Sequence, residues 1–122
     1  MAKTIMIVDD SASLRQVVGI SLRGAGYEVI EGCDGADALK KLTGQKVHLI
    51  ISDVNMPNMD GISLVKAVKA LPAYKFTPIV MLTTESQDAK KQEGQAAGAK
   101  AWVTKPFNPP QLLAVVQKLV LP

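Results

Sequence analysis

The segment from Leu49 to Gly61 constrains the fold more than any other part of the chain, because a short apolar run there ends abruptly before an aspartate. Leu49 to Ile51 is apolar throughout and lies between two turn-prone regions, which is typical of a strand buried on both faces of a parallel sheet. Asp53 follows, and Pro57 with the Asp60-Gly61 pair indicates a loop that leads into a helix. Because ligands bind beyond the carboxyl ends of strands in open α/β sheets, the sequence predicts a site around Asp53.

The same pattern occurs at the start of the chain, where Thr4 to Val8 is a β-branched and apolar run that ends in Asp9 and Asp10. We expect strands at residues 4–8, 27–31, 47–52, 79–82 and 101–104, each followed by a helical pattern. The strand at 27–31 contains two glutamates, which predicts a partly exposed edge strand. Five strands that alternate with five helices give an α/β fold, a three-layer sandwich around a five-stranded parallel sheet.

Capping residues mark where the expected helices begin. Ser13 with Gln16 forms a capping-box pattern for the first helix, and the predicted N-caps of three others are Asp34, Asp60 and Asn108. The fourth helix is the exception, because its inner face offers only alanines and Gly94 lies in its interior. We therefore expect that helix to be weakly held.

Length and composition limit the classes of protein that remain. The chain has 122 residues, of which 48% are hydrophobic, which suits one domain over residues 1–122. We see no run of about 18 apolar residues and no signal peptide, so we expect a cytoplasmic protein without membrane insertion. The net charge of +3 comes from lysines spread over several helices, with no DNA-reading motif, so we expect no nucleic-acid partner. Cys33 is interpreted as a small buried residue.

Polar residues gather at one predicted edge of the sheet. The first, third, fourth and fifth strands end in Asp9 and Asp10, in Asp53, in Thr83 and in Lys105. Clustered carboxylates repel one another, and burying them without a compensating cation is costly. Oxygen ligands with room for water favour Mg²⁺, while the lack of histidine and cysteine in the cluster argues against zinc.

Carboxylates, a bound Mg²⁺, a hydroxyl and a lysine are the groups that phosphoryl transfer requires. The metal and the ammonium neutralise the phosphoryl oxygens, while a nucleophile attacks in line. A carboxylate can be that nucleophile and then forms an acyl phosphate. The predicted edge therefore has the composition of a phosphoryl-transfer site with an aspartate as acceptor.

These residues, in this order, resemble a known family. The motifs are Asp9-Asp10, Asp53 with Met56-Pro57 and Asp60-Gly61, Thr83, and Lys105-Pro106-Phe107. Together they resemble the receiver domain of two-component response regulators, in particular the stand-alone CheY-like chemotaxis type. The resemblance covers the whole chain and implies the flavodoxin-like strand order 2-1-3-4-5.

The resemblance also implies roles for individual residues. Asp53 would be the phosphoacceptor, with Thr83 and Lys105 contacting the phosphoryl group. The Mg²⁺ ligands would be Asp9, Asp10, Asp53 and the backbone carbonyl of Asn55. Pro106 would follow a cis peptide bond. Trp102 stands where the family usually has Tyr or Phe as its switch aromatic, which is a departure from the family's pattern.

The implied function is that of a signalling switch that catalyses only its own phosphoryl transfer and slow autodephosphorylation. It would take phosphate from a sensor histidine kinase onto Asp53 and change a protein-binding surface that Thr83 and Trp102 control. Because no output domain follows, we expect a monomer in chemotaxis or motility signalling, with a target such as the flagellar motor switch and with a phosphatase as a further partner. The alternative is a phosphate sink or relay receiver in another two-component pathway.

Two rival functions fit the residues less well. Phosphohydrolases of the haloacid dehalogenase type carry a second aspartate two residues after the nucleophile, whereas Asn55 stands there. A flavin carrier needs a phosphate-binding loop with backbone donors and hydroxyls, whereas the first loop here is the acidic Asp9-Asp10-Ser11. His48 lies at the start of its strand, away from the predicted site, and is interpreted as structural.

Overall fold

The computed structural model describes residues 3–42, 44–54, 56, 58–84, 98–105 and 108–120, with only the backbone at residue 84. Its five strands all run parallel in one sheet of order β2-β1-β3-β4-β5, which confirms the predicted fold class. The strands are β1 (Thr4–Val8), β2 (Glu28–Gly32), β3 (Leu49–Asp53), β4 (Ile79–Thr84) and β5 (Ala101–Lys105).

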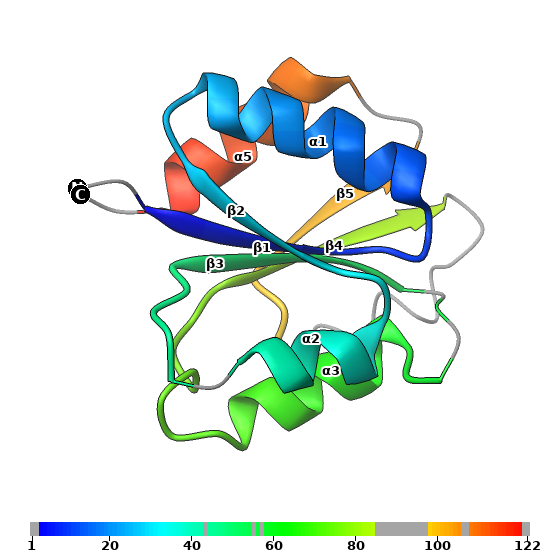
Figure 1. Ribbon diagram of the computed structural model, residues 1–122, viewed down its shortest axis with the longest axis vertical. Coiled ribbons are helices and arrows are strands. Elements are labelled where there is room, and N and C mark those ends of the chain that lie inside the picture. The colour runs from blue at the N-terminus through cyan, green and yellow to red at the C-terminus, as the bar shows by residue number, and fades with distance from the viewer. Residues whose placement is uncertain are drawn as a thin grey trace.

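Helices cover both faces of this sheet. The described helices are α1 (Ala12–Gly24), α2 (Gly35–Lys41), α3 (Gly61–Lys69) and α5 (Pro109–Leu119). In Figure 1, α1 and α5 lie on one face, and α2 and α3 on the other, which gives the three layers. The expected fourth helix falls within residues 85–97, outside the described residues. None of the helices that the structure describes has the length and apolar character needed to cross a membrane.

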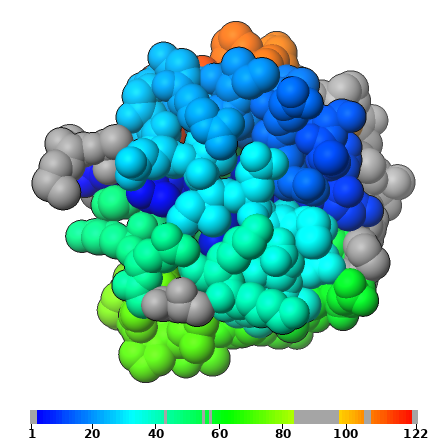
Figure 2. Space-filling model, in the orientation of Figure 1, coloured from blue at the N-terminus to red at the C-terminus, as the bar shows by residue number. Residues whose placement is uncertain are grey.

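The three central strands are buried on both sides, as their apolar runs predict. Along β1, Met6 and Val8 pack in the layer beneath α2 and α3, while Ile5 and Ile7 pack in the layer beneath α1 and α5. β3 and β4 alternate in the same way. Figure 2 shows β2 crossing the front of the molecule between α1 and α2, so the edge strand screens β1 from solvent. The two apolar layers hold the sheet and leave its ends for polar groups.

The helix starts agree with the capping predictions in three of four cases. Asp34, Asp60 and Asn108 are N-caps, and each side chain accepts a hydrogen bond from the backbone N–H three residues later. The prediction for α1 was wrong, because Ser11 and not Ser13 is the N-cap, accepting from the N–H of Leu14 at 3.2 Å. The chain turns into α1 immediately after the β1 carboxylates, which leaves no room for a longer loop.

Two further sequence predictions need correction. β3 starts two residues later than expected and extends to Asp53, which pairs with Leu82 of β4, so the aspartate is the last residue of the strand. Cys33 is exposed, not buried, because it follows the end of edge strand β2. Its backbone N–H donates to the carboxylate of Asp37 at 3.0 Å, which fixes this turn outside the core.

Helix α3 begins directly against the end of β3. The N–H of Gly61 donates to the carbonyl oxygen of Val54 at 2.8 Å. A Cβ atom at residue 61 would lie 2.1 Å from the carbonyl oxygen of Asp53 and 2.8 Å from the methyl group of Met81. Only glycine allows this approach, so Gly61 fixes the distance between α3 and the strand end that carries Asp53.

We predict that Gly61→Ala lowers the free energy of unfolding by about 3 kcal/mol or more, because an overpacked methyl group must push α3 away from the backbone of β3. Urea denaturation followed by circular dichroism measures this loss.

Gly24→Ala is the matched control. Nothing lies within 4 Å of a Cβ atom at this helix end, and the substitution should leave stability unchanged or raise it by up to about 1 kcal/mol. Equal stability of the two variants would contradict the close approach at Gly61.

Candidate functional site

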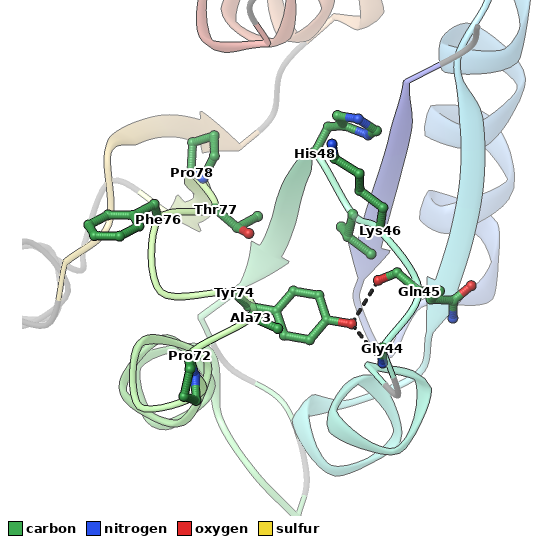
Figure 3. A pocket seen from close by; sticks show the side chains of 11 residues that line it. Gly44, Gln45, Lys46, His48, Pro72, Ala73, Tyr74, Phe76, Thr77 and Pro78 are labelled. Atoms are coloured by element: carbon green, nitrogen blue, oxygen red, sulfur yellow. Dashed lines mark hydrogen bonds between the residues drawn. The ribbon is translucent and has the colours of Figure 1, made fainter.

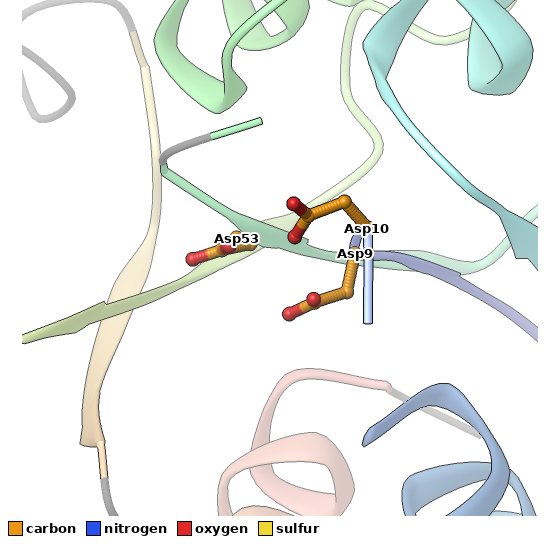
Figure 4. A group of neighbouring side chains, drawn as sticks. All are labelled: Asp9, Asp10 and Asp53. Atoms are coloured by element: carbon orange, nitrogen blue, oxygen red, sulfur yellow. The ribbon is translucent and has the colours of Figure 1, made fainter. Parts of the chain in front are cut away.

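Three carboxylates meet at the carboxyl edge of the sheet. Asp9 and Asp10 follow β1, and Asp53 ends the neighbouring strand β3. One oxygen from each lies within 4.8 Å of the others, and Figure 4 shows the three side chains gathered at this edge. Asp9 and Asp53 are buried, while Asp10 is exposed. The cluster predicted from the strand ends is therefore present, with one side open to solvent.

Lys105 joins two of these carboxylates. Its Nζ atom lies 3.2 Å from Oδ2 of Asp9 and 3.1 Å from Oδ1 of Asp53. Each carboxylate also accepts a backbone hydrogen bond, Asp9 from Ser11 at 2.8 Å and Asp53 from Val54 at 2.9 Å. Asp9 and Asp53 are thus each held by a backbone N–H from the residues that follow them and by the ammonium group of Lys105 on β5.

The protonation behaviour follows from this burial. Burial and the negative charge of Asp9 raise the pKa of Asp53 above its ordinary value of 3.8, against the opposing effect of Lys105. Burial lowers the pKa of Lys105, but the charges of Asp53 and Asp9 outweigh burial and raise it above its ordinary value of 10.5. Lys105 therefore stays charged at neutral pH, and the site still holds more negative charge than one ammonium can balance.

Arg15 of α1 supports the backbone of Asp9, a role that was not predicted from the sequence. Its guanidinium donates to the backbone carbonyl of Asp9 at 2.5 Å and pairs with Glu31 of β2 at 3.1 Å. Arg15 lies in the second turn of α1, where a basic residue gives no signal of its own. Its role depends on α1 folding back over the end of β1, which only the tertiary structure shows.

The loop after Asp53 is tied to the loop before α2. Asn58 has a left-handed backbone, with φ of 65°, and its amide group donates to Oδ2 of Asp34 at 2.7 Å. The N–H of Gly35 donates to the carbonyl oxygen of Met59 at 3.3 Å. Asn58 was also missed, although asparagine in a loop before a helix is a known residue for this conformation. The predicted metal ligand Asn55 and Pro106 lie outside the described residues.

Thr83 and Trp102 lie next to the site on β4 and β5. Thr83 is buried, and it comes directly after Leu82, which pairs with Asp53. Across β4 and β5, Met81 pairs with Trp102 and Thr83 with Thr104, so Thr83 and Trp102 lie diagonally on one face of the sheet. Trp102 is partly buried against the layer beneath α2 and α3, and its buried indole N–H has no acceptor among the described residues.

Comparison with known proteins identifies a family for this arrangement. Residues 5–117 match the family described as the response regulator receiver domain. The chemotaxis response regulator CheY4 of Vibrio cholerae, known from a high-resolution structure, is 51% identical in sequence, with a TM-score of 0.92 and coverage of 98% of this chain and 99% of that one.

Two other similar proteins come from other signalling settings, a transcriptional regulator and a sensor histidine kinase. The phosphate regulon transcriptional regulatory protein PhoB of Pseudomonas aeruginosa is 36% identical over 114 residues, which cover 93% of this chain and 50% of that protein. The receiver domain of a sensor histidine kinase from Pseudomonas aeruginosa was solved with a magnesium ion in its active site cleft. It is 26% identical, with a TM-score of 0.89 and coverage of 98% of both chains.

The raised pKa of Asp53 predicts a pH-dependent cost to folding in Mg²⁺-free buffer. Below the ordinary pKa of 3.8, Asp53 is protonated in both folded and unfolded states and costs nothing. As the pH rises, the unfolded state loses its proton first, so the wild type loses stability until the pH passes the folded-state pKa. We expect Asp53→Asn to lack this loss, which amounts to about 1.4 kcal/mol for each unit by which the pKa is raised.

Urea unfolding of the wild type and of Asp53→Asn measures the difference in their free energies of unfolding. The measurements run from pH 3.5 to pH 7.5, about four units that include the titration of Asp53. Saturating Mg²⁺ should shrink the gap at neutral pH, because the cation compensates the repulsion between the carboxylates. If the difference in free energy of unfolding between the wild type and Asp53→Asn changes with neither pH nor Mg²⁺, the unbalanced charge at Asp53 is contradicted.

Proposed function

Because the chain belongs to the response regulator receiver domain family, we propose that it accepts a phosphoryl group on Asp53 from a sensor histidine kinase. A receiver domain is a signalling switch of two-component systems and not an enzyme of the ordinary kind. The observation that carries the proposal is the position of Asp53, a buried strand-end carboxylate 3.1 Å from the ammonium of Lys105 and next to two further aspartates.

The proposed transfer moves one phosphoryl group between two side chains. A carboxylate oxygen of Asp53 attacks the phosphorus atom of a phosphohistidine, the P–N bond breaks as the P–O bond forms, and the imidazole nitrogen recovers a proton. Lys105 neutralises charge on the phosphoryl oxygens, and the hydroxyl group of Thr83 donates to one of them. Hydrolysis of the acyl phosphate by water would reset the switch slowly.

The residues of the site fit a magnesium ion. Three carboxylates within 4.8 Å of one another offer oxygen ligands only, and their charge exceeds that of Lys105. We propose that Asp9, Asp10 and Asp53 hold Mg²⁺ together with the backbone carbonyl of Asn55, which is outside the described residues. When bound, the ion supplies positive charge that stabilises the transferring phosphoryl group.

We place the protein in chemotaxis or motility signalling because its similarity to CheY4 covers nearly the whole of both chains. In this proposal, residues 1–122 act as one monomeric receiver domain in the cytoplasm, with a flagellar motor protein as target and a phosphatase that resets it. PhoB, of which the chain matches only half, supports the alternative of a receiver in another two-component pathway. Target capture with phosphorylated and unphosphorylated protein distinguishes these settings.

We propose that Thr83 and Trp102 carry the signal away from Asp53. A phosphoryl group would draw the Thr83 hydroxyl toward Asp53, and Trp102 lies diagonally across from it on the same face of the sheet. The buried indole N–H of Trp102 has no hydrogen-bond acceptor among the described residues. Because an unsatisfied buried donor costs free energy, this favours a second rotamer of Trp102. A partner protein would bind the surface of β5 and the helices beside it, and would there distinguish the phosphorylated from the unphosphorylated state.

We predict that Asp53 is the sole phosphorylation site. Acetyl phosphate with Mg²⁺ should add one phosphoryl group to the wild type and none to Asp53→Asn, as measured by intact mass. Asp10→Asn should need at least about ten times more Mg²⁺ for half-maximal labelling, because it lacks one charged ligand.

Asp60→Asn is the matched control, since asparagine preserves the N-cap of α3 and Asp60 is not in the carboxylate cluster. It should be labelled like the wild type. Full labelling of Asp53→Asn would refute the assignment of the acceptor.

We predict that Trp102 reports the phosphorylated state, since it is the only tryptophan of the chain. Beryllofluoride, which mimics the phosphoryl group, should reduce access of iodide to Trp102 and shift its emission to shorter wavelength, because the indole turns inward. Thr83→Ala should show less than about half of this response, and Thr83→Ser, which keeps the hydroxyl group, should retain it. If emission and quenching are the same in both states of the wild type, Trp102 is fixed packing and not a switch.

A further inference from the structure

The described residues form a concave region at the end of the sheet opposite the carboxylates. One hollow of about 480 Å³ lies between residues 44–48, which precede β3, and residues 72–78, which connect α3 to β4 (Figure 3). An adjoining hollow of about 340 Å³ is lined in addition by Lys100 and by the end of α5. The two share His48, Phe76 and Pro78, so we treat them as one and name it the basal groove.

Hydrogen bonds hold the walls of the basal groove in place. The hydroxyl group of Tyr74 accepts from the N–H of Gly44 at 3.0 Å and donates to the carbonyl of Gln45 at 2.7 Å, which ties one wall to the other (Figure 3). Lys69 donates to the carbonyl of Thr77 at 2.7 Å. The groove is therefore built into the fold, and it does not depend on a loose surface loop.

Phe76 is an apolar anchor at the junction of the two hollows. The residue is 88% exposed, and Figure 3 shows its side chain pointing away from that of Tyr74. A phenylalanine this exposed costs free energy in water unless another surface covers it, and aromatic residues are enriched where proteins bind partners. Together with Pro78 it offers a small apolar patch in the middle of the groove.

The rim of the groove is positively charged. Lys46 lines the first hollow and Lys100 the second, and no aspartate or glutamate is among the described lining residues of either. Nearby cations are close enough to affect one another: burial, Lys3 and Lys46 lower the pKa of His48, and burial and Lys100 lower the pKa of Lys69. This concentration of charge on one face favours an anionic occupant.

We propose that the basal groove binds an extended acidic peptide segment of a partner protein, with an aromatic or aliphatic side chain against Phe76 and carboxylates beside Lys46 and Lys100. Two adjoining hollows that share three lining residues suit an extended chain, since a compact small molecule would fill only one. A second copy of this chain is a poor occupant, because it carries a net charge of +3 and the same lysine-rimmed groove, and these positive charges repel Lys46 and Lys100.

Binding there leaves the phosphorylation site free. His48 precedes β3 and Asp53 ends it, so the five-residue strand separates them by about 16 Å. The groove shares no residue with the carboxylate cluster. The proposal therefore does not depend on the function of Asp53, and it predicts an interaction that Asp53→Asn retains.

The test uses the full chain labelled with ¹⁵N and a synthetic peptide in which Leu-Phe is flanked on each side by three glutamates. Titration should shift the amide signals of residues 44–48, 73–77 and 98–100 more than those around Asp53. Two control peptides, one with lysines in place of the glutamates and one with Gly-Ser in place of Leu-Phe, should bind at least about ten times more weakly.

Exposed residues of the groove give variants that should keep the fold. Phe76→Ser should weaken binding about tenfold, and Lys46→Gln and Lys100→Gln about two- to fivefold each. Lys40→Gln, an exposed lysine of α2 outside the groove, is the matched control and should bind like the wild type.

Absence of shifts in the groove at millimolar peptide overturns the proposal, as does binding that Phe76→Ser leaves unchanged. A single-stranded DNA oligonucleotide and vesicles with anionic lipid are tested in parallel. If either binds as well as the acidic peptide and depends equally on Lys46 and Lys100, the groove is a general anionic surface and the peptide proposal is wrong.

Discussion

The contact of Lys105 with Asp9 and Asp53 is the interaction on which the rest of the site depends. It joins residues 96 positions apart in sequence and brings β5 to the ends of β1 and β3. Without that ammonium, the neighbouring carboxylates would be buried with no compensating charge, which proteins avoid because of the cost of desolvation. With Lys105 in place, Asp9 and Asp53 are held together, but the three carboxylates still carry more negative charge than one ammonium group balances. A bound cation would reduce this excess of negative charge.

Several helices and loops approach the backbone of the site closely. Gly61 allows α3 to start against the backbone of Asp53, and Arg15 holds the backbone of Asp9 from the opposite layer. The Asn58–Asp34 hydrogen bond ties the loop after β3 to the start of α2. These three contacts come from separate elements, and together they hold the backbone on either side of Asp9 and Asp53.

A parallel sheet gives the molecule two chemically different ends. The carboxyl end gathers acidic side chains within 4.8 Å of one another, whereas the amino end has a groove rimmed by Lys46 and Lys100. Because all strands point the same way, residues before and after each strand are sorted to opposite ends, and the apolar layers between them keep the two charged regions apart. This separation allows two surfaces to bind different partners without direct competition.

The sequence by itself determined the architecture, because apolar runs such as Leu49–Ile51 and caps such as Asp34 and Asp60 act locally. It also indicated the carboxylate edge, since parallel strands must bring their ends together. Tertiary structure alone decided the exposure of Cys33, the support of Asp9 by Arg15 and the basal groove around Phe76. Those features depend on how distant segments pack, and a side chain's burial or partner is set by neighbours that no local pattern identifies.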